Sequence, residues 1–297
     1  MKRTPLAHQR RSAIIVPAAS FSDNAALRAS SIAGALCTIV EIEGSFSRRL
    51  GAQLAILPSG QMVGSMADGC LEAALSAHAA RGGKPQIVRY GGNDAAIDER
   101  LPCGSSLTIC VEPEPDRTAL RECVELLDRR EVATLAAGCG GTRRYIPELR
   151  IVAIGTGPEL VALHRQAAAF GAEVIALAPH GKGLGGGGGG GLSLGQVPDI
   201  ALDPWTAVLV LFHDHEWERT LLPWALASQC FYIGAQGGQE TRRARMAFLK
   251  QQGFDTPASR MDRLHGPVGI IAHARDPQVL ALSALAQIVA CYEALPR

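Results

Sequence analysis

The chain has 297 residues, of which 47% are hydrophobic, 5% are aromatic and 33 are glycine. This length accommodates two hydrophobic cores, and the composition favours an α/β protein over a β-sandwich. The formal net charge of +1 argues against a general electrostatic attraction to nucleic acid or to anionic membranes.

The N-terminus carries basic residues before a short apolar run that Pro17 interrupts. We interpret it as a tail, with a secretory signal as the alternative. No segment reaches the roughly 18 consecutive apolar residues of a membrane span. The eight cysteines are scattered, without a CxxC pair or zinc-ribbon spacing, which predicts free thiols in a reducing compartment. We therefore expect a soluble, cytoplasmic protein.

The first half of the chain alternates predicted helices and strands. The expected elements are a helix over 22–35, a strand over 37–44, a hairpin over 52–65, a helix over 71–83, strands over 85–90 and 106–113, and a helix over 117–130. The charged, glycine-containing segment 139–148 is typical of a linker. We therefore predict a mixed α+β domain over residues 1–145 and a second domain over residues 146–297.

Two glycine-flanked cysteines lie in the first domain. Cys70 follows Gly69 at the predicted start of a helix, where the helix dipole and unpaired N–H groups favour a thiolate. Cys103 precedes Gly104 at a turn where the backbone can approach a ligand closely. The alternative for each is a small buried hydrophobic side chain.

The second half opens with a β-α-β unit over residues 149–180, which predicts a Rossmann-like domain with a mostly parallel sheet. The turn Gly155-Thr156-Gly157 lacks the third glycine of a dinucleotide fingerprint. Pro179-His180 follow the second strand where a ribose-binding acid is expected. The helix start at Pro158 still offers N–H groups to a phosphate.

Polar residues follow a buried strand predicted over 207–212. His213 and Asp214 stand at its C-terminal end, where open α/β sheets bind ligands. The run continues through His215 and Glu216, but consecutive strand residues alternate faces, so a ligand contact is favoured over a metal site. The seven glycines 185–191 predict a flexible loop.

The last segment contains another strand with a glycine turn over 231–238 and then a basic helix. Arg242, Arg243 and Arg245 on that helix either clamp phosphate or form a solvated face. His265 lies in a predicted loop over 263–270 and is either a ligand or a simple loop histidine. Asp276 is the predicted cap of a C-terminal helix.

These stretches together resemble the XdhC/CoxI family of molybdenum-enzyme maturation factors. The family's first-domain pattern aligns with GSFSRRLGAQLAILPSGQMVGSMADGCLE (44–72), and its glycine-cysteine motif aligns with PCGSSLTICVEP (102–113). Its Rossmann domain aligns with GTGPE, FHDHEWE, YIGAQGG and RLHGPVG. The ordered matches run through nearly the whole chain.

The resemblance implies a chaperone that binds the molybdenum cofactor (molybdopterin) and protects it while a cysteine desulfurase installs its terminal sulfido ligand. The chaperone then passes the cofactor to a xanthine dehydrogenase-type apoenzyme. Cys70 and Cys103 would contact the metal end, and the helix start at Gly157-Pro158 would take the pterin phosphate. The implied cofactor-binding residues are Cys70, Cys103, Gly104, Gly155, Gly157, His213, Asp214, Gly234 and His265.

Two other functions compete with this interpretation. The β-α-β unit alone would suit an NAD(P)-dependent oxidoreductase, and a Rossmann subunit without a ligand of its own is the third alternative. No catalytic residue and no resident metal site are assigned, and neither nucleic acid nor a membrane is expected as a partner. Apolar faces such as the helix around Leu280 suggest a homodimer.

Overall fold

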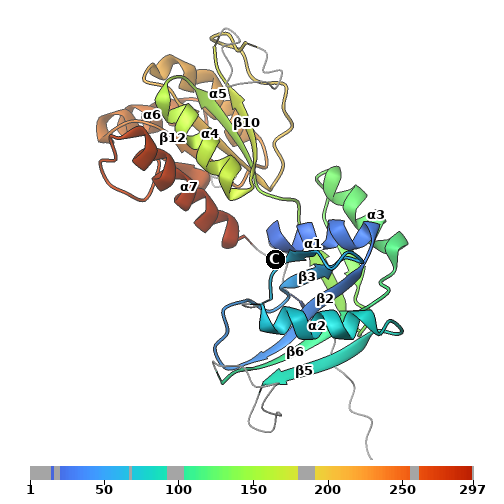
Figure 1. Ribbon diagram of the computed structural model, residues 1–297. Coiled ribbons are helices and arrows are strands. Elements are labelled where there is room, and N and C mark those ends of the chain that lie inside the picture. The colour runs from blue at the N-terminus through green and yellow to red at the C-terminus, as the bar shows by residue number, and fades with distance from the viewer. Residues whose placement is uncertain are drawn as a thin grey trace, which may run out of the picture. The chain divides into compact units, whose positions relative to one another are not determined.

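The computed structural model describes residues 15–16, 21–66, 69–91, 104–179, 191–254 and 261–295. Most of the predicted N-terminal tail, Cys103, His180 and most of the glycine run 185–191 lie outside these ranges, as does the side chain of Cys70. Contacts divide the chain into two units, with the division between Pro147 and Glu148. Each unit is described by itself (Figure 1).

The first unit is built on a five-stranded antiparallel sheet with the order β4-β3-β2-β6-β5. Its strands are β2 (Ala35–Glu43), β3 (Gln53–Ile56), β4 (Met62–Gly64), β5 (Gln86–Gly91) and β6 (Ser106–Glu112). Pro58-Ser59-Gly60 make the tight turn between β3 and β4, where Leu57 N donates to Gln61 O at 2.9 Å. The predicted hairpin is thereby confirmed.

Helices cover both faces of this sheet (Figure 1). On one face, α2 (Cys70–Ala80) packs Leu71 and Leu75 against the buried side chains of β2, β3 and β6. On the other, α1 (Phe21–Ile32) and α3 (Arg117–Asp128) pack against Leu36 and Ala55. Alternating strand residues thus point to two different cores.

A second, three-stranded sheet joins β1 (Ile15–Val16), β8 (Thr142–Tyr145) and β7 (Ala133–Ala136). The sequence suggested a linker over 139–148, but β8 pairs antiparallel with β7. The charged residues of this segment made the strand hard to recognise, because an arginine is expected to be exposed. Arg143 is instead buried and donates to the Gly51 carbonyl oxygen. Tyr145 is fully buried, and its hydroxyl contacts Gln53.

A disulfide links the two sheets. Cys110 of β6 is bonded to Cys139 in the turn between β7 and β8, with the two Cα atoms 6.0 Å apart. The expectation of free thiols is therefore wrong for this pair. The two cysteines are 29 positions apart in the sequence and carry no pairing signal, because the contact arises only when the hairpin folds onto the sheet. The other cysteines whose side chains are described form no disulfide: Cys37, Cys123, Cys230 and Cys291.

The second unit has a five-stranded, all-parallel sheet with the order β10-β9-β11-β12-β13. The strands are β9 (Arg150–Gly155), β10 (Glu173–Leu177), β11 (Thr206–Leu211), β12 (Tyr232–Ala235) and β13 (Leu264–His265). The order reverses at β9, as in Rossmann-type sheets, so the predicted fold class is confirmed. The predicted loop around His265 is wrong at β13, because two residues are too few to show a strand period.

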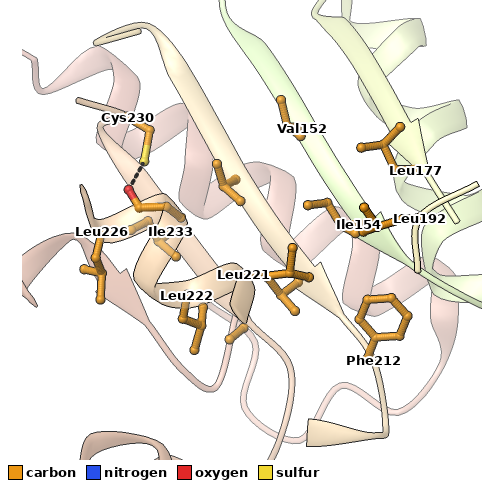
Figure 2. Close-up of a cluster of buried hydrophobic side chains, with 14 of the residues drawn as sticks. Val152, Ile154, Leu177, Leu192, Phe212, Leu221, Leu222, Leu226, Cys230 and Ile233 are labelled. Atoms are coloured by element: carbon orange, nitrogen blue, oxygen red, sulfur yellow. Dashed lines mark hydrogen bonds between the residues drawn. The ribbon is translucent and has the colours of Figure 1, made fainter. Parts of the chain in front are cut away.

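Helices also cover both faces of the parallel sheet. Figure 2 shows the core under α5 (Glu218–Ala227), where Leu221 and Leu222 meet Val152, Ile154 and Ile233. Leu249 of α6 (Gln239–Gln251) joins the same core. On the other face, α4 (Pro158–Phe170) packs against α7 (Pro277–Glu293).

Candidate functional site

A cavity of about 600 Å³ opens at the C-terminal ends of β11 and β12. This is the edge at which open parallel sheets bind their ligands. Its polar lining comes from His213, His215, Gln236, Gln239, His273 and Arg275, and its apolar lining includes Phe212, Val268, Ile270, Ile271 and Leu280. The cavity can therefore hold a partly apolar ligand and also meet its hydrogen-bonding groups.

The two residues predicted at the end of β11 separate in the structure. His213 lines the cavity. Asp214 does not line it, because its carboxylate accepts from Glu216 N at 3.0 Å and caps the short 3-10 helix His215–Trp217. The chain turns there and brings His215 back to the cavity wall. This turn is a feature that strand alternation alone could not predict.

A buried ion pair stands behind this wall. Arg245 of α6 donates through Nε to Glu218 Oε2 at 2.6 Å and through Nη2 to Glu218 Oε1 at 2.7 Å. The same Nη2 donates to Gln236 O at 2.6 Å, which fixes the end of β12. Both charged residues are buried, at 4% exposure for Arg245 and 5% for Glu218. Arg245 is thus a structural brace, while Arg242 and Arg243 are exposed.

The opposite wall is a strap of chain, residues 267–275, that is tied to α7. Gly269 N donates to Gln287 Oε1 at 2.8 Å, and Ile271 N donates to Ser283 Oγ at 2.7 Å. Ile270 and Ile271 line the cavity but remain 64% and 45% exposed. The strap therefore presents apolar side chains beside an open mouth.

The glycines predicted to bind cofactor lie elsewhere in the unit. Gly155 is buried at the end of β9, and a Cβ there would run into Leu211 O. Gly157 has φ +85° and precedes α4 as its exposed N-cap. Neither residue lines the cavity. Because Gly155 lies so close to β11, packing alone explains why this position is a glycine.

Gly234 and His265 support the cavity from behind. Gly234 lies in β12, where a Cβ would approach the Tyr232 ring and Val268 within 3.0 Å. The His265 ring stacks on Tyr232 with centroids 4.5 Å apart. Burial lowers the pKa of His265, which favours its neutral form. Val268 lines the cavity, so Gly234 shapes it by leaving room for this side chain, and His265 acts through Tyr232.

In the first unit, the N-terminus of α2 at Cys70 is capped by a carboxylate. Gly69, with φ +102°, donates its N–H to Glu72 Oε2 at 2.9 Å. Met66 N donates to Glu72 Oε1 at 3.0 Å, and Glu72 is 7% exposed. Glu72 was not among the predicted site residues, although an acid three residues after a helix cap is a known signature. Gly104, the neighbour of Cys103, is exposed just before β6.

The free cysteines described in the first unit are poor thiolates. Burial, with a further contribution from the Glu112 charge, raises the pKa of Cys37 to about 12. Burial, with a contribution from Glu122, also raises the pKa of Cys123. Neither thiol is ionised at neutral pH. Cys70 and Cys103 therefore remain the candidates in this unit for contact with a soft metal.

The described residues form neither a metal-binding cluster nor a membrane-spanning helix. Within those ranges, no three His, Cys, Asp or Glu side chains are grouped so that they could hold a metal ion. Of the helices formed by the same residues, none combines the length and apolar character that crossing a membrane requires.

Comparison with known proteins identifies the two units. The model of the XdhC Rossmann domain matches residues 151–288, and the model of the XdhC and CoxI family matches residues 27–91. The molybdenum cofactor insertion chaperone PaoD of Escherichia coli K12 is 28% identical over 277 residues, which cover 85% of this chain and 81% of PaoD.

A solved structure shares the fold. It is that of a xanthine dehydrogenase from Bacillus halodurans, with a TM-score of 0.72 and 19% identity. The match covers 93% of this chain and 97% of that one, and at this identity it supports the fold alone. The two family models fall on the two units described above, and the chain belongs to the XdhC and CoxI family.

Proposed function

We propose that the protein is a chaperone for the molybdenum cofactor. It binds the cofactor and protects it in the cytoplasm while a cysteine desulfurase installs the terminal sulfido ligand. It then delivers the cofactor to a xanthine dehydrogenase-type apoenzyme. The similarity to the insertion chaperone PaoD over most of both chains carries this proposal.

The cavity of the second unit suits the organic part of this cargo. A pterin is a flat heterocycle with hydrogen-bond donors and acceptors on its edges. Val268 and Ile271 offer apolar contact, while His213, His215 and Gln236 offer polar groups. A cavity of about 600 Å³ is within the usual range for small-molecule sites.

Cys70 and Cys103 are the residues that we assign to the molybdenum end of the cargo. Thiolates are soft ligands and suit this metal. Cys70 opens α2, so a thiolate there would benefit from the positive end of the helix dipole. Glu72 satisfies N–H groups around this start, which moderates that benefit.

A second copy of the chain is also part of the proposal. Val279 and Leu282 on α7 are 40% and 57% exposed, and a homodimer would cover them. Light scattering coupled to size-exclusion chromatography tests this assembly, and a monomer at all concentrations would contradict it.

The function is tested by anaerobic purification from a host that makes the molybdenum cofactor. Iodine oxidation followed by fluorescence detection measures the pterin, and metal analysis of the same sample measures molybdenum. We expect near-stoichiometric amounts of both. Protein that lacks pterin but binds NAD(P)(H) tightly would favour the oxidoreductase, and protein that binds neither would favour a structural subunit.

A further inference from the structure

His215 lines the cavity, and both nitrogens of its ring have a neighbouring side chain within hydrogen-bonding range. Its Nδ1 atom lies 2.9 Å from Glu218 Oε1, and its Nε2 atom lies 3.4 Å from Thr241 Oγ1. The side chain is 45% exposed, so a ligand can reach it. Both ring nitrogens therefore have an identified environment before any ligand binds.

The first contact fixes which nitrogen carries the proton. Glu218 accepts from two donors of Arg245, whose guanidinium is always charged, and this bidentate pairing is the geometry that a guanidinium forms with a carboxylate. An ionised carboxylate can only accept hydrogen bonds. The hydrogen between Glu218 and His215 must therefore belong to Nδ1, and in the neutral ring Nε2 is left with its lone pair.

The second contact leaves Nε2 available. A separation of 3.4 Å from the Thr241 hydroxyl is long for a hydrogen bond whose donor is O–H. A ligand that donates to Nε2 could replace this contact at little cost. An oxyanion without hydrogen could not, because it would place its lone pairs against the lone pair of Nε2.

We propose that the Arg245–Glu218 pair makes His215 a hydrogen-bond acceptor and that His215 thereby selects the N–H edge of a pterin over a phosphate group. This inference rests on the proposed function, since it names the part of the cargo that reaches His215. His215 is the contacting residue. Glu218 and Arg245 are positioning residues that act through its ring.

The protonation of the ring is tested without any ligand. Nitrogen-15 NMR of the histidine-labelled full chain distinguishes protonated from unprotonated ring nitrogens, and His215→Phe assigns the signal. We expect the Nδ1–H form in the wild type. In Glu218→Gln, the amide oxygen stays at the Oε2 position opposite Arg245 Nε, because Nη2, which donates to the Oε1 position, has Gln236 O as a second acceptor. The amide nitrogen then takes the Oε1 position and faces Nδ1, and the ring changes to the Nε2–H form.

Glu216→Gln is the matched control, because Glu216 is an exposed carboxylate in the same segment that pairs with Arg219. It should leave the His215 signals unchanged. An Nε2–H form in the wild type would overturn the inference, as would a ring form that Glu218→Gln does not alter. The wild-type spectrum decides the tautomer even if Glu218→Gln fails to fold.

Ligand selection is tested with neopterin and with inorganic sulfate, an oxyanion that carries no hydrogen at neutral pH. We expect Glu218→Gln and His215→Phe each to weaken neopterin binding by about tenfold, the effect of one well-placed hydrogen bond. The double variant should lose no more than either single variant. Neither substitution should weaken sulfate binding.

Unchanged neopterin affinity in both single variants would overturn the inference. Failure of the proposed function gives a different result, in which the wild type binds no neopterin and carries no cofactor when purified. The pterin part of the inference would then be overturned with it, while the NMR result would still decide the tautomer.

Discussion

Glu112 is a buried carboxylate at the end of β6. Burial raises its pKa, and a hydrogen bond of 2.9 Å from Gly138 N partly opposes the shift. A carboxyl group with a raised folded-state pKa stabilises the protein below its unfolded pKa, and this stabilisation is lost as the pH rises through the folded value. At neutral pH Glu112 is therefore a source of instability in the first unit.

Replacing this carboxyl group should make the protein less sensitive to alkaline pH. We expect Glu112→Gln to keep an acceptor for Gly138 and to have a larger free energy of unfolding than the wild type at pH 8. The difference should disappear below pH 4. Urea unfolding followed by circular dichroism measures both values. A variant that is less stable than the wild type at pH 8 would contradict the assigned burial effect.

The two candidate cysteines should matter for cargo and not for folding. We expect Cys70→Ala and Cys103→Ala each to lower the pterin content of the purified protein or to speed oxidation of the bound cofactor in air. Cys123→Ala is the control, because Cys123 is a free thiol on the buried face of α3 in the same unit. Thermal unfolding should be little changed in the two site variants. Normal cofactor content and protection with both thiols removed would exclude the assigned role.

Among the secondary-structure elements, the β9–β11 pair depends on a glycine that the sequence suggested as a ligand contact. Gly155→Ala should destabilise the second unit by about 1–3 kcal/mol, because the added methyl group meets the Leu211 carbonyl and overpacks the strand pair. Thr156→Ala, one residue later and exposed, is the control. Fluorescence of Trp205, Trp217 and Trp224, which all lie in this unit, reports the urea transition.

The hairpin β7–β8 depends on the disulfide. Closing a loop of this length lowers the entropy of the unfolded chain, so losing the bond should cost about 3–4 kcal/mol. We expect Cys139→Ala to lower the melting temperature of the first unit and to make it independent of added reductant. Calorimetry with and without dithiothreitol tests this. Equal melting of the wild type in both conditions would show that the bond contributes nothing.

The sequence predicted the elements that carry a strong local signal. The buried strand of β9, the glycine turn after it and the Asp276 cap of α7 are each encoded within a few residues, and the structure has all three. β8 and β13 were missed because burial of Arg143 and the pairing of His265 depend on distant strands. The pairing of Arg245 with Glu218 spans 27 residues and has no local pattern.

The candidate site was predicted only in part for the same reason. His213 follows its strand directly, so its place at the cavity could be anticipated. His215 depends on the turn that Asp214 caps, and the strap 267–275 depends on hydrogen bonds to α7. These contacts join segments that are far apart in the sequence.

At the scale of the whole molecule, each unit has its own hydrophobic core, and the described residues that line the cavity belong to the second unit. We expect the fragment 148–296 to fold alone and to bind neopterin as the full chain does. The fragment lacks Cys70 and Cys103, so it should not protect the molybdenum end from oxidation. Titration calorimetry and an air-oxidation assay separate the two properties. Loss of neopterin binding in a folded fragment would show that the first unit contributes to the cavity.

The brace behind the cavity restricts how this family can vary. Arg245 Nη1 occupies the space that a side chain at Gly266 would need, and its two bonds to Glu218 prevent it from moving aside. Substitution at either position alone should therefore be disfavoured during evolution. Relatives with a larger residue in place of Gly266 are expected to have a shorter one in place of Arg245 and to have lost the acid in place of Glu218. These three positions, which span 49 residues of the sequence, would then covary among relatives.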